Sequence, residues 1–143
     1  MKLSQIILEG PIEYDPAFNK QIDKIQDRGG KYLGSGDYGS VYLLDGKAVK
    51  VTTDEVELDH AELLKGKKTN NFVFIYDVSR LGDKLGVITM DVMGEFKGEI
   101  PEDFIDALEA EAKRLGIPSD ELDIRPDNFM INPKSGKLKM TDV

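Results

Sequence analysis

The stretch that decides the fold of this chain reads Leu122-Asp123-Ile124-Arg125-Pro126-Asp127-Asn128-Phe129-Met130-Ile131. It contains the pattern D-x-x-P-x-N, and the three apolar residues that follow have the character of a short buried strand. Such a loop directly before an apolar strand is uncommon by chance. The pattern indicates either a loop that carries chemistry at the start of a strand or an Asx-rich turn without a ligand.

A second motif lies near the start of the chain: Gly34-Ser35-Gly36-Asp37-Tyr38-Gly39-Ser40-Val41-Tyr42. Glycines at positions i, i+2 and i+5 let a backbone approach phosphate groups, because no Cβ stands in the way. In a dinucleotide-binding fold this pattern opens a helix, whereas here an apolar strand follows it. The motif therefore predicts a strand-loop-strand flap, and the alternative is a glycine-rich hairpin without a ligand.

The third signal is a lysine within the next predicted strand, Ala48-Val49-Lys50-Val51. Side chains alternate between the two faces of a strand, so Lys50 points away from the face that Val49 and Val51 share. That opposite face is where a nucleotide would lie beneath the glycine loop. The alternative is an ordinary solvated lysine.

Taken in order, these motifs resemble those of protein kinases, over about residues 31–143. The resemblance implies an ATP- and magnesium-binding cleft. The glycine loop would cover the nucleotide with Gly34, Ser35, Gly36, Gly39 and Val41. Lys50 would pair with the α and β phosphates, as the lysine of the kinase V-A-I-K strand does.

The resemblance also assigns roles near the end of the chain. Asp123 would be the base that orients the attacking hydroxyl, and Arg125 would contact the γ-phosphate. Asn128 would hold a magnesium ion together with Asp142, which stands where kinases place the aspartate of D-F-G. Antibiotic and choline kinases share the D-x-x-P-x-N loop, so the motif does not select a protein substrate.

Kinases pair the strand lysine with a glutamate on the following helix, for which this chain has three candidates, Glu55, Glu57 and Glu62. We favour Glu57, because Ala61 and Leu64 at i+4 and i+7 continue its face into the core. The alternative is a solvated helix glutamate.

Residues 88–93 resemble the hinge strand of kinases. The resemblance implies that Met90 is the gatekeeper and that the backbone carbonyl of Asp91 and N–H of Met93 meet the adenine edge.

Two departures separate this chain from a typical kinase. Glu121-Leu122 replaces the histidine and arginine of H-R-D, and the sequence stops one residue after Asp142. The activation segment and the substrate-binding helices of the family are therefore absent from it. His60, the single histidine, lies far from the catalytic-loop motif in sequence, and we expect it to be a packing or surface residue.

Composition excludes several classes. The 143 residues contain no cysteine, which excludes disulfides and thiolate sites and fits a reducing, cytoplasmic setting. No apolar run reaches the ~20 residues that cross a bilayer, and a net charge of −8 disfavours nucleic acid. Residues 95–127 contain eleven acidic and four basic residues, a net charge of −7. This acidic stretch is either a solvated helix face or a docking surface for a basic partner.

The pattern of elements predicts a single α+β domain. Residues 1–30 would be an N-terminal extension, with a strand at 4–8 and a helix that Asp15-Pro16 starts and Gly29-Gly30 ends. Residues 31–93 would form an N-lobe with strands at 32–33, 41–44, 48–51, 72–78 and 85–92. Its one core helix would be capped by Thr53 or Asp54. Residues 94–143 would form a rudimentary helical C-lobe with a helix from Pro101 to Gly116 and a final hairpin.

Three functions remain open for such a chain. The first is a minimal phosphotransferase that uses ATP and magnesium and acts on a protein Ser/Thr or a small-molecule hydroxyl. The second is a pseudokinase-type module that binds a protein partner. The third is an acidic inhibitor acting through residues 95–127. The Thr141-Asp142-Val143 tail is similar to that of small kinase-like chains encoded by tailed phages.

Overall fold

An antiparallel five-stranded sheet forms the first part of the molecule in the computed structural model, which describes residues 16–36, 38–82 and 84–142. The strand order is β1-β2-β3-β5-β4. The strands are β1 (Lys31–Ser35), β2 (Gly39–Leu44), β3 (Lys47–Thr52), β4 (Ile75–Gly82) and β5 (Leu85–Met90). Asp45 and Gly46 make the turn between β2 and β3, and both have positive φ, as tight hairpin turns require.

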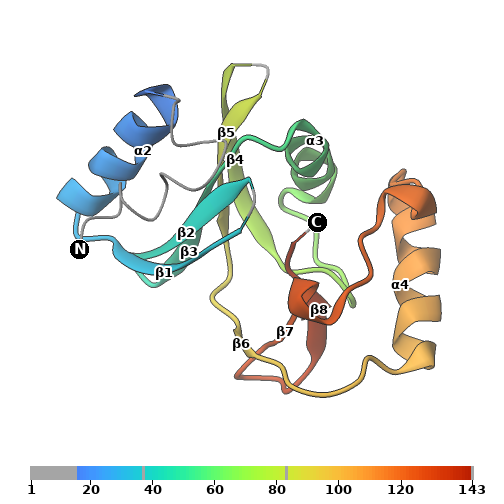
Figure 1. Cartoon of the computed structure of the whole chain (residues 1–143). Helices are drawn as coiled ribbons and strands as arrows, with labels where there is room; N and C mark the ends of the chain where they lie inside the picture. The colour runs from blue at the N-terminus through green and yellow to red at the C-terminus, as the bar shows by residue number, and fades with distance from the viewer. Residues whose placement is uncertain (1–15, 37, 83, 143) are drawn as a thin grey trace.

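Two helices cover opposite faces of this sheet (Figure 1). Helix α2 (Pro16–Asp27) buries Phe18, Ile22 and Ile25, which recur at helical spacing, against one face. Helix α3 (Glu55–Leu64) buries its apolar side against the other face. Asp54 caps α3 by accepting from the backbone N–H groups of Val56 and Glu57, which decides between the two predicted caps.

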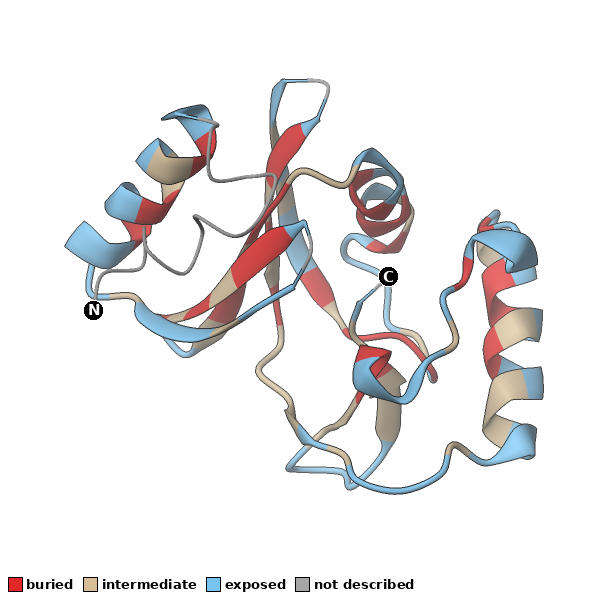
Figure 2. Ribbon diagram, in the orientation of Figure 1, coloured by how far each residue is buried: buried red, intermediate tan, exposed pale blue. Residues whose placement is uncertain are grey.

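The alternation along β3 agrees with the prediction for Lys50. Val49 and Val51 are buried on the side of α2, whereas Lys50 reaches Glu57 on α3, on the opposite face. Figure 2 shows the buried residues of α2 and α3 facing the sheet between them. Lys50 is therefore the polar member of an otherwise apolar strand.

The C-terminal part begins with β6 (Gly94–Glu95) and helix α4 (Glu102–Leu115). Two short 3-10 helices follow, η2 (Ser119–Glu121) and η3 (Pro126–Asn128), and then the hairpin of β7 (Phe129–Ile131) and β8 (Leu138–Met140). The predicted helix and hairpin are confirmed, and Gly116 ends α4 with a φ of 86°. β6 was not predicted. It pairs with β7, giving a small sheet of order β6-β7-β8.

One apolar cluster joins the two parts of the molecule. It contains Leu58 and Ile88 from the first part together with Leu108, Phe129 and Met140 from the second. Backbone bonds connect the same parts, because Val73 N–H donates to Met140 O at 3.0 Å and Met140 N–H donates to Asn71 O at 2.8 Å. The C-terminal part is thereby held in a defined place against the sheet.

The predicted strand at residues 72–78 is wrong in its bounds. The backbone of residues 72–74 bonds to Met140 and to Asp91 outside the regular ladder, so β4 begins at Ile75 and continues to Gly82. The strand predicted at residues 85–92 likewise ends early, at Met90. The strand predicted at residues 4–8 and the cap at Asp15 lie outside the described residues. No helix of the described ranges is long and apolar enough to cross a membrane.

Glu111 on α4 joins the two parts of the molecule through hydrogen bonds, and its substitution tests how much this contact contributes to stability. Its buried carboxylate accepts from Asn70 N–H at 3.0 Å, from Asn71 N–H at 2.8 Å and from the Asn71 amide at 3.1 Å. We expect Glu111→Ala to lower the free energy of unfolding by about 3 kcal/mol, because buried donors lose their acceptor. Asp106→Ala, at an exposed position of the same helix, should change it by less than about 0.5 kcal/mol. Urea unfolding measures both, and equal effects would contradict this account.

Candidate functional site

A cavity of about 690 Å³ lies between the β1–β2 hairpin, β3, α3, the segment after β5 and the loop before β7. All thirteen site residues that the sequence predicts line it. They are Gly34, Ser35, Gly36, Gly39, Val41, Lys50, Glu57, Asp91, Met93, Asp123, Arg125, Asn128 and Asp142. The end of the described chain lies beside α3 in Figure 1, which brings Asp142 to residues some ninety positions earlier.

The three glycines of the loop act differently. A Cβ on Gly39 would lie 2.5 Å from the carbonyl oxygen of Val51, so glycine is needed there for β2 to approach β3. A Cβ on Gly34 or Gly36 would meet nothing within 4 Å, which leaves open space beside the loop. Gly36 N–H donates to Gly39 O at 2.9 Å and closes the turn. Asp37 lies outside the described residues.

Lys50 lies between two carboxylates at the centre of the cavity. Its Nζ is 2.6 Å from Glu57 Oε2 and 3.0 Å from Asp142 Oδ1. The side chain of Glu57 is 3% exposed and that of Asp142 is 49% exposed. The predicted contact of Lys50 with Glu57 is therefore present, and Asp142 joins it.

The pKa values of these two carboxyl groups shift in opposite directions, and the more deeply buried group has the raised pKa. The 2.6 Å contact with Lys50 favours ionised Glu57, but burial outweighs it and raises the pKa of Glu57 to about 7. For Asp142 the balance is reversed: burial acts against its charge, but the nearby ammonium group of Lys50 prevails and lowers its pKa. Burial also acts against the charge of Lys50, but Glu57 and Asp142 outweigh it and raise the pKa of Lys50. Burial therefore favours the neutral form of Glu57, whereas the ammonium group of Lys50 favours the ionised form of Asp142.

Asn128 organises the loop before β7. It is 3% exposed, and its side-chain amide donates to Asp123 O at 2.7 Å. Its own backbone carbonyl accepts from Thr141 N–H at 2.9 Å and from Asp142 N–H at 3.4 Å. Asn128 and Asp142, the two predicted metal ligands, thus belong to one hydrogen-bonded unit.

The oxygens of this unit fit a magnesium ion. No group of three or more histidine, aspartate and glutamate side chains that could hold a metal occurs in residues 16–36, 38–82 and 84–142. Magnesium is commonly bound by one or two protein oxygen ligands, with water and phosphate oxygens completing the octahedron. Asn128 and Asp142 supply such oxygens.

Arg125 lies against Asp123, whereas the sequence predicts that it contacts a phosphate. Its Nε and a terminal nitrogen lie 2.9 Å and 2.7 Å from the two carboxylate oxygens of Asp123. Both side chains are more than half exposed, so solvent screens this pair and a ligand can displace it.

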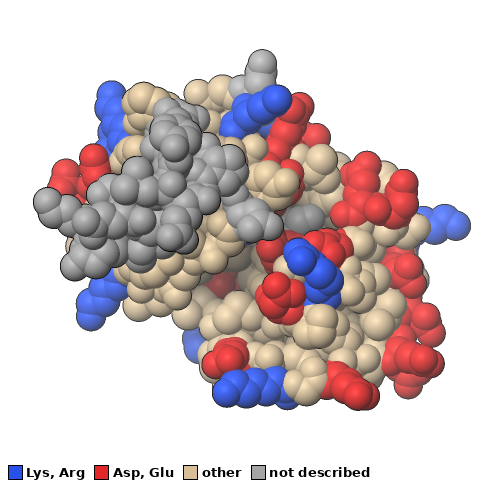
Figure 3. Space-filling model, in the orientation of Figure 1, with Lys and Arg blue, Asp and Glu red and all other residues tan. Residues whose placement is uncertain are grey.

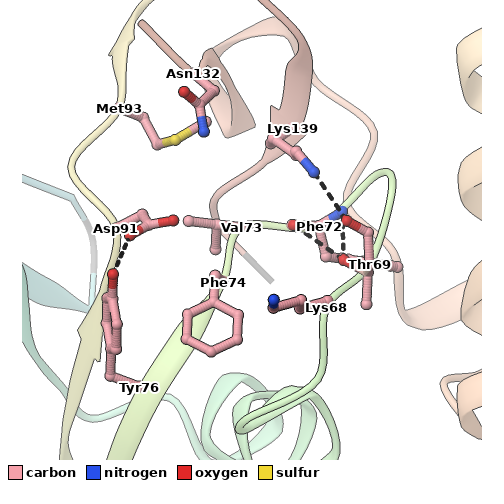
Figure 4. Close-up of a pocket in the computed structure, with 10 residues that line it drawn as sticks. All are labelled: Lys68, Thr69, Phe72, Val73, Phe74, Tyr76, Asp91, Met93, Asn132 and Lys139. Carbon is pink, nitrogen blue, oxygen red and sulfur yellow. Dashed lines mark hydrogen bonds between the residues drawn. The ribbon is translucent and has the colours of Figure 1, made fainter. Parts of the chain in front are cut away.

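The segment after β5 presents backbone groups to the cavity. Asp91 N–H donates to Phe74 O at 3.1 Å, whereas the carbonyl of Asp91 and the N–H of Met93 make no hydrogen bond with a described residue. A second cavity of about 410 Å³ lies on the outer side of this segment, and Asp91 and Met93 line both. Figure 4 shows Tyr76 donating to the Asp91 carboxylate there, at 2.5 Å. Tyr76 therefore holds the Asp91 side chain on the outer side.

Several residues of this region were not among the predicted site residues, and two of them contact each other. Glu121 lines the cavity, and His60 of α3 lies 2.7 Å from it. His60 is 2% exposed, so it is buried and not a surface residue. The available signal was the replacement of H-R by Glu121-Leu122, but nothing local connects that position to His60.

No protein-family model matches the sequence, and no curated protein matches it. Solved structures do. The kinase domain of Mycobacterium tuberculosis PknI superposes with a TM-score of 0.54 at 18% identity, over 78% of this chain and 57% of that chain. Rad53 1-466 in complex with AMP-PNP gives 0.54 at 16% identity, over 87% of this chain and 42% of that chain.

The chain has a protein-kinase-like fold. At these identities the likeness concerns the fold alone. The fold is α+β, with an antiparallel N-lobe sheet, one core helix and a rudimentary C-lobe, as predicted. The chain spans little more than half of the PknI domain and less than half of the Rad53 chain.

The raised pKa of Glu57 predicts that the stability of the fold depends on pH. A carboxyl group whose pKa is higher in the folded than in the unfolded protein stabilises the fold at low pH, and this stabilisation is lost as the pH rises to the folded pKa. The window for Glu57 runs from 4.5 to about 7. Between about pH 5 and about pH 8, we expect the wild type to lose on the order of 2 kcal/mol more stability than Glu57→Gln. Urea unfolding across this range checks it, and parallel profiles for the two proteins would refute it.

Proposed function

We propose that this chain is a minimal kinase-like phosphotransferase that uses ATP and magnesium. The observation that carries the proposal is the contact of Lys50 with both Glu57 and Asp142, beside Asn128 and opposite the glycine loop. These groups come from five separate segments, and their convergence in one cavity supports a common role. The AMP-PNP bound to Rad53, which has the same fold, gives further support.

In this proposal the nucleotide supplies the phosphoryl group, and magnesium neutralises charge on its phosphates. Lys50 contacts the phosphates, and Glu57 holds the lysine side chain in place. Asn128 and Asp142 supply metal ligands, while the Asp91 carbonyl and the Met93 N–H bind the adenine edge. Gly34, Ser35, Gly36 and Gly39 cover the phosphates, with Val41 against the base.

Asp123 is proposed to accept the proton of the attacking hydroxyl, which belongs to a protein Ser/Thr or to a small molecule. Arg125 occupies both oxygens of Asp123 in this structure. In the proposed complex it turns toward the γ-phosphate and frees one oxygen of Asp123 for the acceptor. A cytoplasmic setting and the absence of a nucleic-acid partner belong to the same proposal, supported by the lack of cysteine and the net charge of −8.

A binding module without catalysis is the second candidate. The pairing of Asp123 with Arg125 favours it, because a base with both oxygens occupied is not ready to act. Acidic side chains gather at the edge of the molecule where α4 lies (Figure 3), with Glu102, Asp103 and Asp106 exposed. This surface would contact a basic protein partner, either as a pseudokinase or as an inhibitor.

Nucleotide binding is tested by thermal unfolding with ATP, with and without magnesium. Ligand at about 100 times its dissociation constant should add about 2.7 kcal/mol, which raises the melting temperature by several degrees. We expect Asp142→Asn to lose the magnesium-dependent part of this shift, and Asp120→Asn, an exposed control, to keep it. The absence of any shift for the wild type at millimolar ATP would contradict the proposal for the isolated chain.

Catalysis is tested separately with Asp123→Asn. This variant keeps the size of the side chain but cannot accept the hydroxyl proton, so ATP turnover should fall by about 10²- to 10⁴-fold. Magnesium–ATP affinity should stay within about threefold of the wild type, because Asp123 is not among the proposed nucleotide contacts. ADP release with an acceptor hydroxyl in excess measures turnover. A wild type that binds magnesium–ATP without turnover would support the binding module.

A further inference from the structure

Helix α3 carries two buried polar side chains one turn apart, Glu57 and His60. Residues three apart lie on the same side of a helix, so both face the C-terminal part of the molecule. Glu57 reaches Lys50, which in turn contacts Asp142. His60 reaches Glu121, with its Nε2 2.7 Å from Glu121 Oε1.

Burying an imidazole is unfavourable unless its polar atoms are hydrogen-bonded, and His60 is 2% exposed. A carboxylate oxygen only accepts, so the ring donates from Nε2 to Glu121. The two residues are 61 positions apart in the chain, and their contact therefore joins two elements. Glu121 in turn ends η2, two residues before Asp123, and lines the cavity.

Glu121 stands where the kinase motif H-R-D has its histidine. Leu122 beside it is buried in the cluster that contains Leu58 and Ala61 of α3. The start of the loop thus shares the core that includes α3 through Leu122, and it contacts α3 directly through the hydrogen bond between Glu121 and His60. Apolar packing tolerates sliding, whereas a hydrogen bond between two side chains sets a distance and a direction.

We infer that His60 is a positioning residue, which acts through Glu121 to hold the loop of residues 121–128 against α3. This inference rests on the proposed function. One wall of the cleft then carries Glu57 and Lys50, and the other carries Asp123 and Asn128. The bond between His60 and Glu121 keeps these walls in register, so that the phosphate contacts and the metal ligands meet the same nucleotide.

The test uses Glu121, because its side chain is 44% exposed and its substitution disturbs the core less than a substitution of buried His60. Glu121→Ala removes the bond, Glu121→Gln keeps an acceptor oxygen at the same reach, and Asp120→Ala is the matched exposed control. The affinity for ATP is measured by calorimetry with and without magnesium, at a temperature where each variant is folded. A role in stability alone would leave the affinity of the folded protein unchanged.

Glu121→Ala should weaken magnesium–ATP binding about tenfold, the effect of losing one positioning hydrogen bond. Glu121→Gln should restore most of the affinity, and Asp120→Ala should match the wild type. An affinity of Glu121→Ala equal to that of Asp120→Ala, in the presence of magnesium, would overturn the inference.

Hydrogen exchange separates this inference from the proposed function, because it needs no nucleotide. The amides of Arg125, Asn128 and Thr141 are bonded within the loop unit and report its order. They should exchange faster in Glu121→Ala than in Asp120→Ala. If the wild type binds no magnesium–ATP, the proposed function fails, and the exchange rates of these amides then test the inference by themselves. Equal exchange rates in the two variants would overturn it.

Discussion

Lys50 is the residue on which the rest of the arrangement depends, because one ammonium group lies between two carboxylates from distant parts of the chain. Glu57 belongs to α3, and Asp142 follows β8. Their contacts join the sheet, the helix and the C-terminal segment at a single point. Without Lys50, Glu57 would be a buried carboxylate beside a second carboxylate, which is a costly arrangement. Lys50 lowers the pKa of Asp142, the more exposed of the two acids, and so favours its ionised form. In the proposed function, Asp142 is a metal ligand.

Hydrogen bonds to backbone groups also support this centre. Asn128 fixes the loop through its amide and holds residues 141 and 142 through its carbonyl. Glu111 holds the turn before β4 in the same way, by accepting from backbone N–H groups. Such bonds are short and directional and are little affected by salt, whereas an exposed pair such as Arg125–Asp123 is screened. The contacts that position the cleft are therefore the buried ones, and the exposed pair is free to rearrange.

Much of this arrangement was predictable from short stretches of sequence. Helices α2, α3 and α4 follow from apolar residues at helical spacing and from their end signals, Asp54 and Gly116. The direction of Lys50 follows from strand alternation alone. Each site motif is contiguous, so its residues could be located without knowing what they contact. The bounds of β4 could not be predicted, because the backbone partners of residues 72–74 are Asp91 and Met140, which no local pattern identifies.

Local sequence patterns predicted most of the helices and strands, the face of β3 on which Lys50 lies, and thirteen of the residues that line the cleft. Tertiary structure alone decided the partners: Asp142 for Lys50 across 92 positions, Glu121 for His60 across 61, and Asp123 for Arg125 where a phosphate contact was expected. Periodicity and propensity act over one or two turns of chain, so they specify which side of an element is buried. Which side chain a buried polar group meets depends on how the elements pack, and that is settled only when the whole core forms.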